Sequence, residues 1–413
     1  MSQMHQAVSR VARAFSRREF VAGAGAAAGL ALVSRPALGQ QAAAPFSGPK
    51  LKVAVAGCGG RGQFIANLLA KHGGYEIVAA ADYFQEAADA FGDKFGVPAG
   101  RRFSGLSGYK RALEAKPDAL VVTSPPFFHP EQAAAAVDAG CHAYVAKPVA
   151  VDVPGCLSIE ASGKRATEKK LCFLVDFQTR MNPFYQEAIR LVHGGALGEF
   201  AFGEASYHCG RLNIHPPDGG QEGRVRNWVF DQAFSGDIIT EQNIHALDVM
   251  SWVHGRPPLH AFGTGARKVR VDVGDNWDTF SVIYQYPGNV AMNFSSRQFE
   301  GHGTAEGILC RMFGSKGVLE TSYGGNVLIR GESFYRGGAT KQIYAEGAAA
   351  NVAAFHQAVT GGDFANLTVA PSVQSNLITI MGRKAAYTGR LVTWEATLKD
   401  AERLDGRLEG LKA

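Results

Sequence analysis

An α/β architecture with two domains is expected for this chain: a doubly wound parallel sheet first, then an α+β domain with a large, mainly antiparallel open sheet. Short apolar strands alternate with helical segments over residues 51–175, which is the pattern of βαβ units. Longer segments of alternating hydrophobicity, separated by Pro-Gly and Gly-rich turns, fill residues 176–413. The length of 413 residues also suits two domains.

The elements follow in order from apolar periodicity and turn residues. In the first domain the strands are expected at 53–56, 76–81, 119–123, 143–145 and 172–175, and the helices from 61 onward and at 85–95, 106–115, 130–139 and 155–169. In the second domain the strands are expected at 200–208, 279–286, 290–296 and 307–313, and the helices at 183–193, 237–253, 348–360 and 371–388.

Residues 1–39 have the features of a twin-arginine signal peptide. The run from Ser16 to Phe20 reads SRREF, an apolar stretch follows, and Ala37-Leu38-Gly39 offers a small-residue cleavage site. An uncleaved amphipathic tail is the alternative. We expect a periplasmic or otherwise exported mature protein that begins with a linker at residues 40–50.

The signal peptide also accounts for the positive charge of the chain. Residues 1–39 hold five arginines and one glutamate, which is +4 of the formal +5. We therefore expect no nucleic-acid partner. No second run of 18 apolar residues occurs, so no membrane anchor is expected. The six cysteines show no C-x-x-C or zinc-ligand spacing, so we expect free, mostly buried thiols and no metal site.

A glycine-rich motif follows the first strand and predicts a dinucleotide site. Its backbone N–H groups would meet a pyrophosphate at a helix N-terminus. Asp82 lies 20 residues beyond the motif at the end of the next strand, where a carboxylate bonds ribose hydroxyls. That carboxylate would repel a 2′-phosphate, so NAD is favoured over NADP, although Arg61 could meet a phosphate. A glycine turn in an unrelated α/β protein is the alternative. The expected glycines are Gly57, Gly59, Gly60 and Gly62.

Two further features carry candidate catalytic groups. Lys147 ends another apolar strand, at the edge where parallel sheets bind ligands. Glu241, His245 and Asp248 fall at i, i+4 and i+7, so they share one face of the helix expected over 237–253. A carboxylate one turn before a histidine suits acid–base catalysis at neutral pH. The same spacing suits a solvated ion-pair face equally well, and a metal site lacks a third ligand.

These motifs, taken in order, resemble the Gfo/Idh/MocA family of oxidoreductases from about Leu51 to the end of the chain. Other motifs that support this resemblance are TSPPFFH at 123–129, KP at 147–148 and DFQTR at 176–180. The resemblance implies that Lys147 contacts nicotinamide and substrate. It also implies that His245 takes the proton of a sugar hydroxyl, with Glu241 at the family's aspartate position.

Further residues are candidates for binding cofactor or substrate. The resemblance implies cofactor contacts from the turn that follows the third expected strand. His129 could reach cofactor or substrate or be structural, and Arg180 could bind substrate or form a domain-interface ion pair. Trp228 lies in a Gly/Pro-rich region whose aromatic and cationic groups suit a sugar. The candidates for the cofactor are Thr123, Ser124, Pro125 and His129, and those for the substrate are Gln178, Arg180 and Trp228.

Two departures from the family pattern leave the reaction open. Ala146 replaces the glutamate of the family's E-K-P motif, and Glu241 replaces the commoner aspartate. We expect an oxidoreductase that acts on a sugar or cyclitol hydroxyl, with NAD tightly bound because an exported protein meets no NAD pool. A dimer or tetramer is expected from the resemblance. The alternatives are an NAD-dependent glycosidase using transient oxidation, elimination and re-reduction, and a non-catalytic nucleotide-binding or sugar-sensing protein.

Overall fold

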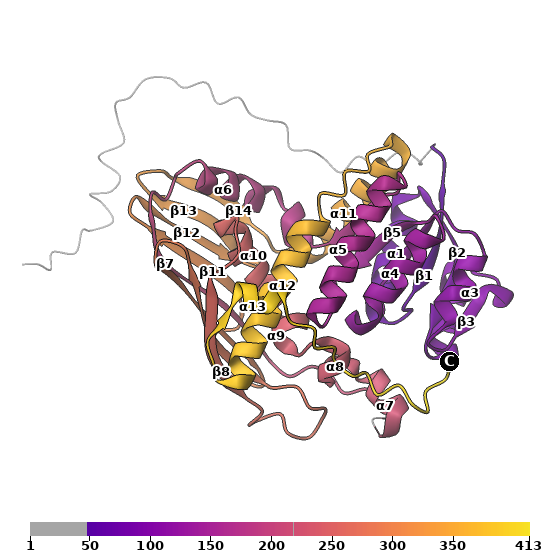
Figure 1. The fold of residues 1–413 in the computed structure, drawn as a ribbon. Coiled ribbons are helices and arrows are strands. Elements are labelled where there is room, and N and C mark those ends of the chain that lie inside the picture. The colour runs from indigo at the N-terminus through magenta and orange to yellow at the C-terminus, as the bar shows by residue number, and fades with distance from the viewer. Residues whose placement is uncertain (1–47, 218) are drawn as a thin grey trace, which may run out of the picture. The chain divides into compact units, whose positions relative to one another are not determined.

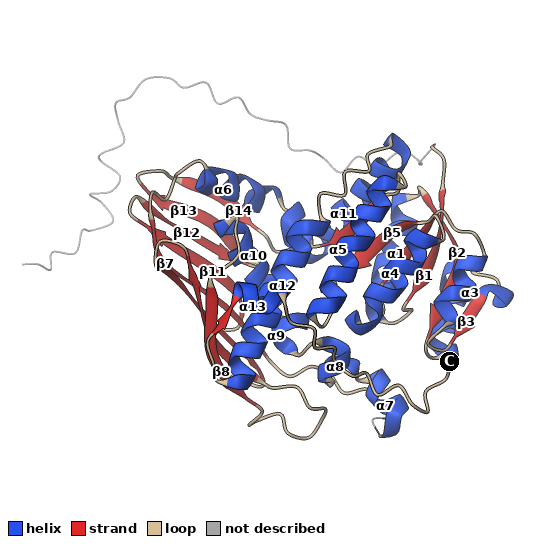
Figure 2. Ribbon diagram, in the orientation of Figure 1, coloured by secondary structure: helices blue, strands red, loops and turns tan. Residues whose placement is uncertain are grey.

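The computed structural model describes residues 48–217 and 219–413. The expected signal peptide and most of the expected linker lie outside the described residues. The described chain forms two sheets with helices between and around them (Figure 1, Figure 2). Within those described residues, no helix has the length and hydropathy needed to cross a membrane.

The first sheet has six parallel strands in the order β3-β2-β1-β4-β5-β6. The order reverses between β1 and β4, and open sheets bind ligands at such a switch point, beyond the carboxyl ends of the strands. The strands are β1 (Leu51–Ala56), β2 (Tyr75–Asp82), β3 (Arg102–Ser104), β4 (Ala119–Val122), β5 (His142–Ala146) and β6 (Phe173–Asp176). The helices between them are α1 (Gly60–His72), α2 (Gln85–Phe95), α3 (Gly108–Glu114), α4 (His129–Asp138) and α5 (Val153–Glu168).

The second sheet has nine strands in the order β14-β13-β12-β11-β7-β10-β9-β8-β15. The β7–β10 pair is parallel and the other pairs are antiparallel, as the sequence predicts for a mainly antiparallel sheet. The strands are β7 (Phe200–Cys209), β8 (His260–Ala266), β9 (Thr279–Tyr286), β10 (Val290–Gln298), β11 (Gly307–Gly314), β12 (Gly317–Ser322), β13 (Asn326–Gly331), β14 (Tyr335–Ala339) and β15 (Val392–Thr393).

Helices cover one face of this second sheet and leave the other face bare (Figure 2). The alternating burial of β9 and β10 matches one packed and one open face. The covering helices are α6 (Pro183–His193), α10 (Ile244–His254) and α12 (Val369–Thr388).

Helix α12 and helix α11 (Ile343–Gly361) contribute side chains to the hydrophobic cores of the first sheet. Val352 and Phe355 of α11 join the core around β1 and β5, and Val373 and Leu377 of α12 join the core around α4 and α5. The cover of the parallel sheet is therefore completed by helices from the end of the chain.

The prediction of one continuous helix over residues 237–253 is wrong. The chain instead forms α9 (Ile238–Glu241) and α10, with Gln242 and Asn243 in a turn between them. The amide of Asn243 donates to the carbonyl of Ile238, five residues back, at 2.9 Å. The Gln242 side chain also accepts a hydrogen bond from buried Gln298 on β10. Because of this break, Glu241 and His245 do not share one helical face.

Candidate active site

The glycine motif builds the tight turn that the sequence predicts. Gly57 has φ +95°, and a Cβ there would overlap the backbone of Thr123 and Ser124. A Cβ on Gly62 would overlap the Gly57 carbonyl. A Cβ on Gly59 or Gly60 would meet no atom within 4 Å, so this side of the turn is open. Because α1 begins there, its first amide groups lack helical partners and suit a pyrophosphate.

Asp82 lies at the end of β2, beside this turn. Its carboxylate accepts hydrogen bonds from the amides of Cys58 at 2.7 Å and Phe84 at 3.0 Å. Burial raises the pKa of Asp82, and the two amide hydrogen bonds oppose that shift. The carboxylate is fixed in place with acceptor capacity remaining, which suits the ribose hydroxyls of NAD.

A cleft of about 760 Å³ runs along the glycine turn and is lined by both halves of the chain. On the nucleotide side it is bounded by residues that include Gly57, Gly59, Gly60, Arg61, Asp82, Thr123, Ser124 and Pro125. On the other side it is bounded by residues that include Val225, Arg226, Trp228, Val229 and Glu241. The turn and cleft together fit a dinucleotide.

Arg61 lines this cleft, but its guanidinium forms an ion pair with buried Asp176. Burial lowers the pKa of Arg61, but Asp176, Tyr344 and Tyr144 together outweigh this effect and the pKa is raised. Asn351 donates to the same carboxylate at 2.7 Å, and the Gln178 side-chain oxygen accepts from Arg61 at 2.8 Å. Arg61 is thus bound both to Asp176 and to Gln178, so its guanidinium is already engaged within the protein.

His129 is 1% exposed and joins two loops beside the cleft. Its ring nitrogens contact the carbonyls of Pro148 at 2.8 Å and Ser124 at 2.7 Å. Burial lowers the pKa of His129 to about 4 and outweighs the two carbonyl contacts, which favour the protonated ring. His129 therefore holds the Ser124 loop against the segment that carries Lys147. This is a structural role, the alternative to contact with cofactor or substrate.

Lys147 links the end of β5 to the end of α9. Its Nζ donates to the backbone carbonyl of Glu241 at 2.6 Å and to the Glu241 carboxylate at 3.1 Å. The two side chains are 14% and 15% exposed. An ammonium group has three donors, so one remains for a substrate oxygen.

His245 opens helix α10 and is 9% exposed. Burial lowers the pKa of His245 well below its ordinary value, and the charges of Lys147 and Arg61 lower it further. Its Nδ1 is buried and makes no hydrogen bond within the described chain, and the same holds for Asn243 Oδ1 and Tyr323 Oη. The rings of His245 and Tyr323 lie 5.7 Å apart. Buried polar atoms without partners mark a place that a hydroxyl-bearing ligand can satisfy.

Arg180 and Asp248 form an ion pair in which the aspartate is buried and the arginine side chain is 18% exposed. Arg180 Nε lies 3.0 Å from both carboxylate oxygens of Asp248, and its Nη2 lies 2.8 Å from Oδ1. Ser375 on α12 donates to the same carboxylate at 2.7 Å. Both residues lie within the second expected domain, residues 176–413, so this ion pair does not join the two expected domains.

Sequence reasoning missed Tyr323 and Asn243. Tyr323 follows β12 in a turn of the second sheet, far from His245 in the chain. Only the tertiary fold brings it to the imidazole, so no spacing pattern could have found it. Asn243 could have been suspected, because it lies between Glu241 and His245 in the chain. The prediction of a continuous helix placed it on a different helical face from those two residues.

The fold and this site define an NAD-binding oxidoreductase, and comparison with known proteins agrees. Residues 51–177 match the oxidoreductase family GFO_IDH_MocA, NAD-binding Rossmann fold, and residues 185–320 match the GFO/IDH/MocA C-terminal domain. The chain belongs to the Gfo/Idh/MocA family and is an NAD(P)-dependent oxidoreductase of that type.

Similar proteins include a myo-inositol dehydrogenase, Hyg17, of Streptomyces leeuwenhoekii, 25% identical over 65% of this chain and 76% of that protein. Glycosyl hydrolase family 109 protein 1 of Akkermansia muciniphila is 29% identical, over 39% of this chain and 35% of that protein. The solved structure of an oxidoreductase from Agrobacterium radiobacter, in complex with NAD+, L-tartaric acid and magnesium, has a TM-score of 0.65 and 17% identity, over 84% of this chain and all of that one. This last likeness shows the shared fold.

Proposed function

We propose that this protein oxidises a ring hydroxyl of a sugar, sugar derivative or cyclitol, with NAD held tightly in the cleft. The observation that carries the proposal is buried His245, whose Nδ1 makes no hydrogen bond within the described chain and whose pKa is lowered by burial and by the charge of Lys147. The similarity to a myo-inositol dehydrogenase supports a cyclitol or a sugar as substrate.

The charge of each residue determines its role in this reaction. A neutral imidazole has one lone pair, so His245 accepts the hydroxyl proton there. Lys147 donates a hydrogen bond to the same oxygen and stabilises its developing negative charge. Glu241 holds the ammonium group in position through its carbonyl and its carboxylate. NAD, when bound, supplies the acceptor for the hydride of that carbon.

A change of His245 to alanine tests the proposal directly. With a panel of cyclitols and aldoses, we expect His245→Ala to lower kcat by about 10²-fold or more, the usual effect of removing a general base. NADH binding should stay intact, because His245 does not line the cleft. His260→Ala, on strand β8, is the matched control and should retain activity. A loss under tenfold in the His245 variant would remove that residue from the role.

A glycosidase that uses NAD transiently is the second candidate. It is favoured by the similarity to a family 109 glycosyl hydrolase and by Ala146 in place of the family's glutamate. Product analysis with an aryl glycoside separates the two reactions. A freed aglycone without net oxidation supports the glycosidase, whereas an oxidised sugar supports the dehydrogenase.

Export by the twin-arginine route completes the proposal. It rests on the sequence of residues 1–39 and on the argument that an exported enzyme must keep its cofactor. The test is N-terminal sequencing of the exported protein together with identification of nucleotide released on denaturation. An intact Met1 in the exported fraction, or a protein free of nucleotide, contradicts it.

We further propose that the open face of the second sheet joins copies of this chain. Phe262 and Ile283 are paired across β8 and β9 on that face and are 52% and 49% exposed. They line a hollow of about 550 Å³. Light scattering should give a dimer or tetramer for the natural chain and a smaller species for Ile283→Lys. An unchanged mass in that variant would place the contact elsewhere.

A further inference from the structure

The last described segment, residues 400–413, runs without helix or strand along the outside of the molecule. We call it the C-terminal clasp. It leaves α13 (Trp394–Leu398), passes α8 (Gln232–Ser235) and α7 (Gly220–Arg226), and reaches the region of β3 (Figure 1). It thereby connects the second sheet's helices to the far edge of the first sheet.

The first part of the clasp is fixed to both halves of the chain. Lys384 on α12 forms ion pairs with Asp400 and Glu402. The amide of Leu404 donates to Asp152, the residue that caps α5, at 3.0 Å. The contacts of the clasp therefore begin directly after α13.

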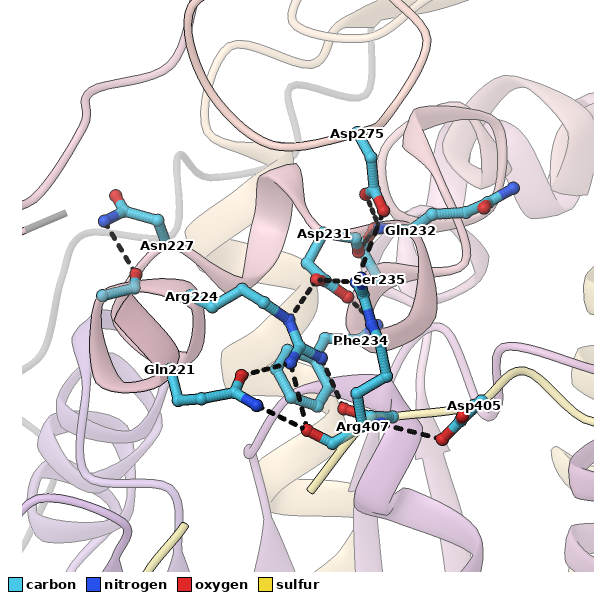
Figure 3. A network of polar contacts seen from close by, with 12 residues as sticks. Gln221, Arg224, Asn227, Asp231, Gln232, Phe234, Ser235, Asp275, Asp405 and Arg407 are labelled. Atoms are coloured by element: carbon cyan, nitrogen blue, oxygen red, sulfur yellow. Dashed lines mark hydrogen bonds and ion pairs between the residues drawn. The ribbon is translucent and has the colours of Figure 1, made fainter. Parts of the chain in front are cut away.

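The middle of the clasp is bound by α7. Arg224 donates to the backbone carbonyls of Gly406 and Arg407, and its Nε donates to Asp231 (Figure 3). Gln221 donates to the Arg407 carbonyl at 3.1 Å. The Arg407 side chain returns to Asp231 at 3.3 Å, so the clasp and the α7–α8 segment bind each other through charged groups.

The end of the clasp contacts the side of the cleft that carries Asp82. The carbonyl of Lys412 accepts from the amide of Leu106 at 3.0 Å, and its own amide donates to Tyr83 Oη at 3.3 Å. Tyr83 and Leu106 line the cleft beside Asp82. Gly105, between them in the lining, has φ +92°, and a Cβ there would overlap the backbone at Ala413.

The clasp therefore joins two opposite walls of one cleft. Val225, Arg226 and Trp228 belong to the wall that α7 and the following turn provide, and Tyr83 belongs to the nucleotide wall. Arg226 also crosses between the walls: its guanidinium lies 4.0 Å from the Phe84 ring centroid and pairs with Glu86 at 2.9 Å. Separation of the walls would therefore break the contacts of the clasp with one of them.

We propose that the C-terminal clasp retains the nicotinamide dinucleotide, because it must detach from α7 or from the Tyr83–Leu106 edge before the cofactor can leave. The inference rests on the proposed function in one respect, that the cofactor is a dinucleotide held in this cleft during turnover. The inference adds to the proposed function the chain segment that determines how fast the cofactor is released.

The release rate of NADH tests this. The full chain is loaded with NADH, mixed rapidly with excess NAD, and followed by NADH fluorescence. The first variant is Gly406→Val, which does not line the cleft; a Cβ there would lie 2.6 Å from Phe127 Cζ, so either the clasp or the Phe127 ring must shift, and we expect the branched side chain to displace the clasp. The second is a chain that ends at Lys399. The matched control is Arg403→Met, an exposed residue of the same segment.

We expect both clasp variants to release NADH about tenfold faster or more, since two or three net hydrogen bonds are lost, and the control to match the natural chain. Equal rates in all four chains overturn the inference, provided that circular dichroism shows the variants folded; the two variants disturb the clasp by different routes. Rapid release from the natural chain contradicts tight binding, which is the proposed function, while the ratio between chains still decides the role of the clasp.

Discussion

The ring of His245 lies close enough to two cations for their charges to lower its pKa. Burial is the larger cause, and Lys147 and Arg61 add to it. The neutral ring is the form that accepts a proton, so kcat/KM should fall only when the pH drops through this lowered pKa. We expect the acid limb of the pH profile to lie well below the 6.5 of an ordinary histidine.

Lys147→Met provides the test of that charge effect. Removing the ammonium group removes one cause of the lowered pKa, so the pKa of His245 should move up toward its ordinary value. The readout is an NMR titration of the His245 ring in the resting protein, which does not depend on activity. Lys110→Met, with a side chain 59% exposed on α3, is the control and should leave the titration unchanged. A His245 pKa that stays the same in both variants contradicts the charge argument.

Choice of nucleotide should depend on Asp82 and not on Arg61. The Asp82 carboxylate repels a 2′-phosphate, so Asp82→Ser should raise the affinity for NADPH relative to NADH by about tenfold or more. Arg61→Met should leave that ratio unchanged because its guanidinium is bound to Asp176. It should also lower the Tm, since buried Asp176 loses its ion pair. Fluorescence titrations with both reduced nucleotides measure the ratio. A fall in NADPH affinity in Arg61→Met would show that Arg61 reaches the phosphate.

Helix α9 is short, but its end determines where the Lys147 ammonium group lies. The last carbonyl of a helix has no helical partner, and the one at Glu241 accepts from Nζ at 2.6 Å. The start of α9 is fixed by Asp237, which has φ +72° and accepts from the Ile238 amide and from Tyr387. Burial raises the pKa of Asp237 to about 6, against the hydrogen bonds that it accepts.

Glu241→Gln separates the two contacts that Glu241 makes. The carbonyl contact to Lys147 remains and only the charge is lost, so we expect kcat to fall less than about tenfold. Lys147→Met removes both contacts and the donor to the substrate, and should lower kcat by about 10²-fold or more. Steady-state kinetics of the two variants give the comparison. Equal losses would mean that the Glu241 carboxylate itself contacts the substrate.

Elements with strong local periodicity could be predicted from the sequence, and their bounds are close. Helices α2 and α6 and strand β9 begin and end where the pattern predicts. Short elements such as β3, α7 and α8 were missed, because three to seven residues carry too little periodicity. The break before α10 was missed for a different reason: the Gln242–Gln298 contact is tertiary, and the apolar pattern runs on through the turn.

Some residues of the candidate site could likewise be predicted from the sequence, and others could not. The glycines, Asp82 and Lys147 lie at ends of strands, where the order of a parallel sheet brings them to one edge, so sequence was sufficient. The partners of Arg61 and Arg180 were not predictable, because Asp176 lies 115 residues from Arg61 and Asp248 lies 68 residues from Arg180, and only the tertiary fold brings each pair together. These arginines look like ligand donors in the sequence, but in the structure each forms an ion pair with a buried aspartate.

Packing across the two halves makes the nucleotide-binding sheet depend on the end of the chain. Phe355 of α11 is fully buried, and its ring lies edge-on to Tyr144 of β5 with centroids 5.5 Å apart. Val352 of the same helix accepts a hydrogen bond from Tyr75 of β2 through its carbonyl at 2.6 Å. The parallel sheet should therefore not be stable without α11, and the described chain should unfold in one transition.

Phe355→Ala tests this dependence. It leaves a cavity next to β5, so the free energy of unfolding should fall by about 3–5 kcal/mol. The loss should appear in the nucleotide-binding sheet: amide hydrogen exchange in β1 and β5 should speed up, although the substitution lies in α11. Phe334→Ala is the matched control, because that ring is 74% exposed and should change neither quantity. Protection in β1 and β5 that survives Phe355→Ala, or two separate transitions in calorimetry, would show that the halves fold independently.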